Sequence, residues 1–254
     1  MNKIYRLAYY TSPEEPMFHQ LRDGDSFIEI MTAIQKKRPK LEYGNIIMNY
    51  DQQGFPGDEK EFWTGKLEKG DLLVQTTRPA LDKDVGYKRL LTNPNWLEDQ
   101  IRKRLRTFFS VCSRKQIHLA DDIKKKITNK HPEWFSQKDS RWINREFSVH
   151  RPYAIIGEKL ETIDNKPMFL TGAYYIYTPE IWEDGPDLLC TFGICGEQNL
   201  LWSYQFRTKF SDLLDNYCFA IISIQFSENE IPEEVYDLSF SDSWDPKIVL
   251  NIAL

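Results

Sequence analysis

The sequence predicts a mixed α/β or α+β fold, in which a central sheet carries a basic, mostly helical insertion. Residues 187–226 alternate short apolar runs with a stretch of helical period, which is typical of a strand-helix-strand unit. Residues 153–178 contain two β-rich runs on either side of the turn sequence DNKP, which indicates a β-hairpin. Residues 93–151 combine helical periodicity with an excess of cations. We expect a sheet of about five to seven strands, close to the usual size.

The composition allows one large core. The chain has 254 residues, of which 41% are hydrophobic and 14% aromatic. We expect a single mixed domain over residues 1–254, because neither half alone offers a complete sheet. The basic insertion at 93–151 then precedes a β-rich C-terminal half at 153–254.

The N-terminal third predicts three strands and a helix. The strands are expected at residues 3–10, 43–50 and 71–76. Ser26 and Glu29 have the spacing of a capping box, so a helix is expected to begin there. Its buried face would consist of Phe27, Ile30, Met31 and Ile34.

The insertion predicts two helices. Asn93 can cap the first, and Pro94 suits its first turn. The buried stripe of this helix would be Leu97, Ile101, Leu105, Phe108 and Cys112. The second helix would bury Leu119, Ile123 and Ile127.

The strand-helix-strand unit is the best-marked part of the chain. A buried strand is expected to end at the glycines 193 and 196, and a second strand covers 217–226. The helix between them has one apolar stripe, made of Trp202, Phe206, Phe210 and Leu213. It is long enough for a right-handed crossover between two inner, parallel strands. A last strand is expected at 247–253.

The cysteines and the N-terminus indicate a cytoplasmic protein. The four cysteines form no C-x-x-C pair and no metal-ligand spacing with the four histidines, and three of them lie in apolar runs. The N-terminus does not have the pattern of a signal peptide, and no run approaches the roughly 20 apolar residues of a membrane span. The sequence indicates no metal site and no particular cofactor.

The charge is unevenly distributed. Residues 101–151 hold 14 basic and 5 acidic side chains, a balance of +9, whereas residues 152–254 hold 5 and 17, a balance of −12. Cations interleaved with aromatic rings can bind phosphates and stack on unpaired bases. The candidate nucleic-acid-binding residues are Arg102, Lys103, Arg104, Arg106, Lys124, Lys125, Lys126 and Trp142. The same cations could instead be a solvated helix face, or could dock on the acidic C-terminal third of this chain or of a second copy in a homo-oligomer.

Two further groups of residues are candidates for catalysis. Cys195 and Glu197 lie in the turn between the predicted strand and helix, where backbone N–H groups can hold an anion and lower the pKa of a thiol. Arg145 and His150 have an R-x4-H spacing, in which His could act as acid or base and Arg could hold a phosphate.

Three functions therefore stay open. The leading hypothesis is a protein that binds an anionic partner, nucleic acid among others, through the basic segment. The first alternative is an enzyme, a hydrolase or transferase, with its site near residues 193–197 at the carboxyl ends of the strands. The second alternative is a protein-binding or inhibitory protein that uses its acidic C-terminal third.

Overall fold

The computed structural model describes residues 2–9, 17–44, 47–49, 58–77, 79, 81, 96–112, 117–130, 162–163, 166–193, 202–227 and 245–254.

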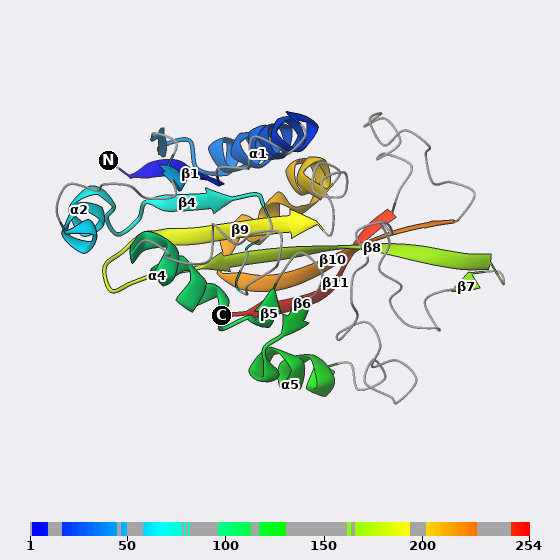
Figure 1. Ribbon diagram of the computed structural model, residues 1–254. Coiled ribbons are helices and arrows are strands. Elements are labelled where there is room, and N and C mark those ends of the chain that lie inside the picture. Colours follow the sequence, from blue (N-terminus) through cyan, green and yellow to red (C-terminus); the bar gives the residue numbers. More distant parts are fainter. Residues whose placement is uncertain are drawn as a thin grey trace.

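A mixed sheet forms the centre of the fold, with the strand order β11-β10-β8-β9-β4-β1-β2 (Figure 1). In addition, β3 pairs with β1 and β7 pairs with β8. The strands are β1 (Lys3–Tyr9), β2 (Glu42–Tyr43), β3 (Ile47–Asn49), β4 (Leu72–Gln75), β7 (Thr162–Ile163), β8 (Lys166–Thr178), β9 (Asp187–Gly193), β10 (Cys218–Ser227) and β11 (Asp245–Ala253). This sheet confirms the predicted mixed α/β class, and it takes strands from both sides of the basic insertion.

One half of the sheet is parallel and the other half is antiparallel. Strands β2 and β3 both run parallel to β1, β1 runs parallel to β4, and β4 runs parallel to β9. Strand β8 is antiparallel to β9 and to β10, and β10 is antiparallel to β11. The carboxyl ends of β1, β4 and β9 therefore lie at the same edge of the sheet, which we call the carboxyl edge; the opposite edge is the amino edge.

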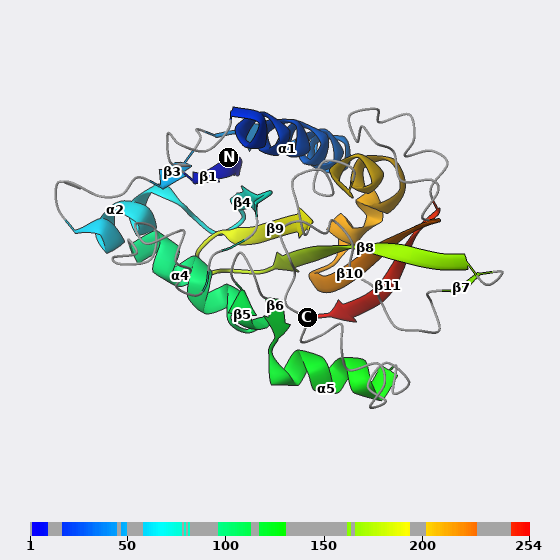
Figure 2. The same ribbon diagram turned by 45° about the vertical axis from the view of Figure 1, so that its right-hand side comes forward.

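Helices cover both faces of the sheet. Figures 1 and 2 show α1 (Met17–Lys37) and the gold helical segment 202–215 side by side over one face. The helix α4 (Trp96–Leu105) and the small sheet of β5 (Phe109–Cys112) and β6 (Ile117–Leu119) pack on the other face. This second face also carries α2 (Glu59–Lys66), through Trp63, and α5 (Asp121–Lys130), through Ile123.

The helical segment 202–215 confirms the predicted apolar stripe. Trp202, Phe206 and Leu213 are buried in the core beneath α1, and Phe210 packs against that core. The segment begins as an α-helix and continues as a π-helix at Phe206–Phe210 and a 3₁₀-helix at Ser211–Asp215. Both flanking strands are inner strands. They run parallel to each other, but β8 lies between them, which the sequence did not predict.

Three predicted helix boundaries are wrong, those of α1, α4 and α5. The helix α5 begins at Asp121, so Leu119, expected in that helix, belongs to β6. The helix α1 begins at Met17, so Ser26 lies inside it rather than at its cap. The predicted buried face of this helix is correct, since Phe27, Ile30, Met31 and Ile34 are all buried. The helix extends beyond the predicted start because packing of its apolar face, rather than the local capping pattern, stabilises it. The helix α4 ends at Leu105, and Cys112 belongs to β5. Cys112 is nevertheless buried, since β5 packs on the same core as the helix stripe.

The amino edge is closed by internal hydrogen bonds. The Asp71 carboxylate accepts hydrogen bonds from the backbone N–H groups of Lys3 (2.7 Å) and Glu68 (3.1 Å). The Asp187 carboxylate accepts hydrogen bonds from the hydroxyls of Tyr177 (3.2 Å) and Tyr217 (2.8 Å). Burial and the hydrogen bond to Asp187 raise the pKa of Tyr217 above its ordinary value. These buried carboxylates are therefore satisfied by donors within the fold.

We expect Asp71→Asn to lower the free energy of unfolding by about 1–3 kcal/mol, because one carboxylate oxygen is replaced by an amide that cannot accept a hydrogen bond. Asp212→Asn is the matched control. It removes an exposed ion pair to Lys37 and should cost less. Urea unfolding of both variants measures the difference, and an equal loss would contradict the anchoring role of Asp71.

Candidate functional site

The path of the chain through the sheet identifies one place where a ligand is expected. From β1 the chain passes through α1 to β2 and β3 on one side of β1, and then through α2 to β4 on the other side. The connections thus change direction between β1 and β4. Open α/β sheets bind ligands outside the carboxyl ends of the strands at such a switch point.

Buried hydroxyl side chains occur in β9, directly after β4 and in the two helical segments that cover one face of the sheet. Thr191 lies in β9 on this face, where its hydroxyl accepts a hydrogen bond from the indole N–H of Trp202. Thr76 follows β4 directly and continues the alternation that places Leu72 and Val74 on the same face. Two serines from the overlying helices are also buried. We call Ser26, Thr76, Thr191 and Ser203 the hydroxyl cluster.

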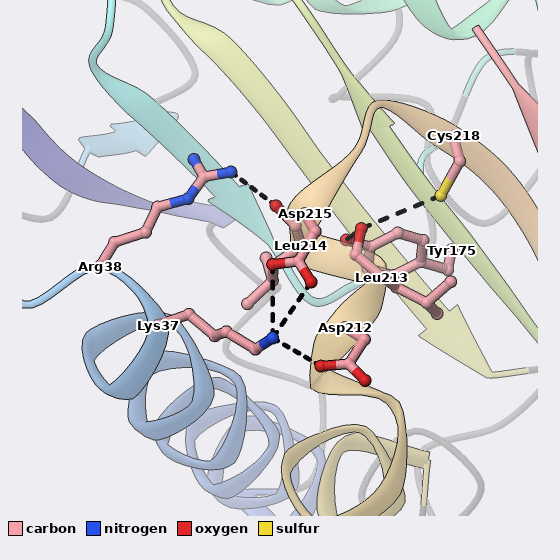
Figure 3. A network of polar contacts seen from close by, with 8 residues as sticks. All are labelled: Lys37, Arg38, Tyr175, Asp212, Leu213, Leu214, Asp215 and Cys218. Carbon is pink, nitrogen blue, oxygen red and sulfur yellow. Dashed lines mark hydrogen bonds and ion pairs between the residues drawn. The ribbon is translucent and has the colours of Figure 1, made fainter.

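Ion pairs fix the position of α1 against the helical segment 202–215. Glu29 of α1 pairs with Arg207. Farther along both helices, Lys37 pairs with Asp212 (2.5 Å) and Asp215 (3.1 Å) (Figure 3). Residue numbers increase together along this interface, so the two helices run parallel. Because each crosses from the carboxyl edge to the amino edge, both N-terminal ends point toward the carboxyl edge.

The far end of this interface is joined to the amino edge. Figure 3 shows Arg38 donating a hydrogen bond to the carbonyl oxygen of Leu214 (2.7 Å), and Tyr175 donating one to that of Leu213 (3.1 Å). The guanidinium of Arg38 also lies 5.0 Å from the ring centre of Tyr177. These contacts hold the two helices at the amino edge, and they satisfy the carbonyl groups at the end of the helical segment.

The charges at the carboxyl edge favour an anion. The N-terminal end of a helix carries a partial positive charge, and two such ends point to this edge. Arg6 is paired in register with Val74, two residues before Thr76, and its guanidinium lies 4.9 Å from the ring centre of Phe27. Glu29 is paired with Arg207, so the opposite charges of these two side chains cancel. The positive charge of Arg6 then adds to that of the helix ends.

The predicted catalytic residues lie outside the described part of the chain. Cys195 and Glu197 belong to residues 194–201, which join β9 to the helical segment. Arg145 and His150, and the predicted base-stacking residue Trp142, belong to residues 131–161. Their roles stay predictions.

The three arginines predicted to bind nucleic acid make contacts within the protein. Arg102 pairs with Glu98 one turn earlier in α4, and its side chain is only 12% exposed. Arg104 donates to the carbonyl oxygens of Pro179 and Glu180, both at 2.6 Å, which ties α4 to the turn between β8 and β9. Arg106 donates to the carbonyl oxygen of Leu81. These guanidinium groups therefore have a structural role, whatever else they contact.

The lysines of the segment form ion pairs with neighbours on their own helices. Lys103 pairs with Asp99 at 2.7 Å, Lys124 with Asp121 at 3.4 Å, and Lys125 with Asp122 at 3.7 Å. Lys125 is 77% exposed, and Lys126 is also exposed. Exposed pairs of this kind add little stability, so a phosphate can replace the carboxylate at small cost. Among the described side chains of the segment, the exposed lysines are Lys103 on α4 and Lys125 and Lys126 on α5, while Arg106 is exposed but bound to the carbonyl oxygen of Leu81.

Sequence reasoning did not find the hydroxyl cluster. Its members come from α1, the end of β4, β9 and the helical segment, so no local motif contains more than one of them. One signal was present in the sequence. Ser26 occupies the position four residues before Ile30, which is a polar break in an otherwise apolar stripe.

Metal binding and membrane insertion find no support in the described ranges. No group of three or more His, Cys, Asp or Glu side chains there has the arrangement that a metal ion needs. Likewise, none of the described helices combines the length and the apolar character of a membrane span.

No protein-family model, no curated protein and no solved structure matches the chain.

Three of the four cysteines are buried thiols. Cys112, Cys190 and Cys218 are buried and take part in no disulfide. Burial raises the pKa of Cys190 well above its ordinary value, and the neighbouring Cys112 adds to the effect. Burial also raises the pKa of Cys218 to about 11. Since the thiolate is the reactive form, these residues are poor nucleophiles at neutral pH.

In the native protein at pH 8, we expect Cys112, Cys190 and Cys218 to react with iodoacetamide roughly 100-fold more slowly than an exposed thiol. Mass spectrometry of peptides sampled over time gives the rate at each cysteine. A rate at Cys195 above that of an exposed thiol would support its role as a nucleophile, and a rate as slow as the other three would contradict it. In guanidinium chloride all four should react alike.

Proposed function

We propose that the protein binds a small polar ligand at the carboxyl edge of its parallel strands. The observation that carries this proposal is the change of direction between β1 and β4. The two edges also differ in a way that supports it: the buried carboxylates of Asp71 and Asp187 at the amino edge are satisfied by donors within the fold, while Thr76 is buried directly after β4 at the carboxyl edge. If the site is catalytic, Cys195 and Glu197 are the candidates closest in sequence to the end of β9.

Two isosteric substitutions at opposite edges test this proposal. A panel of nucleotides, sugar phosphates, carboxylic acids and neutral sugars is screened for thermal stabilisation. A ligand at 100 times its Kd should stabilise the folded protein by about 2.7 kcal/mol. We expect Thr76→Val to weaken every hit and Thr178→Val to leave it unchanged. Both threonines are buried, but Thr178 lies at the amino edge.

A panel without hits, or hits that Thr76→Val does not affect, would show that the carboxyl edge is not the binding site. Equal losses in the two variants would point to a general loss of stability. Urea unfolding of each variant without ligand separates that effect from a loss of binding.

A second candidate function is the binding of an anionic macromolecule, nucleic acid in the first instance, through α5. A specific observation favours this helix over α4: the ion pairs that Lys124 and Lys125 form with Asp121 and Asp122 are long, whereas Arg104 of α4 and Arg106 just after it bind carbonyl groups elsewhere in the protein. Figure 2 shows α5 at the rim of the molecule, on the face of the sheet opposite α1. Three successive lysines there can displace counterions from a phosphate backbone.

Reversal of the three lysine charges tests this candidate. We expect wild-type protein to bind RNA or DNA oligonucleotides at low salt, with log Kobs falling linearly with log salt concentration. Lys124→Glu, Lys125→Glu and Lys126→Glu together should reduce the magnitude of that slope by roughly 0.7–0.9 for each phosphate that the lysines no longer neutralise. Fluorescence anisotropy at several salt concentrations measures it.

The matched control makes the same change of net charge elsewhere. Lys36→Glu, Lys40→Glu and Lys60→Glu alter three exposed lysines that lie outside the basic segment. We expect this control to keep most of the affinity. Equal losses in the two triple variants would mean that net charge alone drives the binding, and no binding at low salt would contradict the candidate.

A further inference from the structure

We draw no further inference here: the strongest candidate, the outer edge of the end strand β11 with its exposed Ile248, pairs with no other strand in the described part of the chain, and nothing in the structure shows what covers it.

Discussion

The parallel pairing of β1, β4 and β9 is the constraint on which the rest of the structure depends. Parallel strands need crossovers, and each crossover returns the chain to the same edge. The pairing therefore places three strand ends at the carboxyl edge and aligns α1 with the helical segment 202–215. The strands β8, β10 and β11 extend the sheet through antiparallel pairs, and β10 runs in the same direction as β9. The chemical difference between the two edges follows from this arrangement.

The buried polar side chains of the protein differ in whether they have hydrogen-bond partners. At the amino edge, Asp71 and Asp187 are buried, and each receives donors from the surrounding backbone or from tyrosines. In the third turn of α1, Ser26 is buried to a similar extent, but its hydroxyl has no partner within the described chain. A folded protein satisfies nearly all of its buried polar atoms, so the two carboxylates follow the rule and Ser26 is an exception to it.

The sequence was sufficient for features that depend on periodicity. The apolar stripe through Trp202, Phe206 and Leu213 was correct, since one side of a helix must be buried whatever its neighbours are. The insertion of β8 between β9 and β10 was not predictable, because strand order depends on pairing between distant segments. The hydroxyl cluster was missed for the same reason. Ser26 and Ser203 are 177 residues apart, and only the packing of α1 and the helical segment 202–215 on one core brings these two parts of the chain together.

The basic insertion shows why a count of charges is a poor measure of a binding surface. A count of the net charge of residues 101–151 gives arginine and lysine the same weight, but the two side chains make different contacts in the structure. A guanidinium has several donors in a fixed plane, which lets Arg104 bind two carbonyl oxygens at once. An ammonium group is compact and strongly hydrated, so Lys125 stays in solvent with a carboxylate 3.7 Å away. Arginine content therefore overstates the charge available to a partner wherever a helix must be tied to loops, and the exposed lysines of α5 are the better measure of that charge.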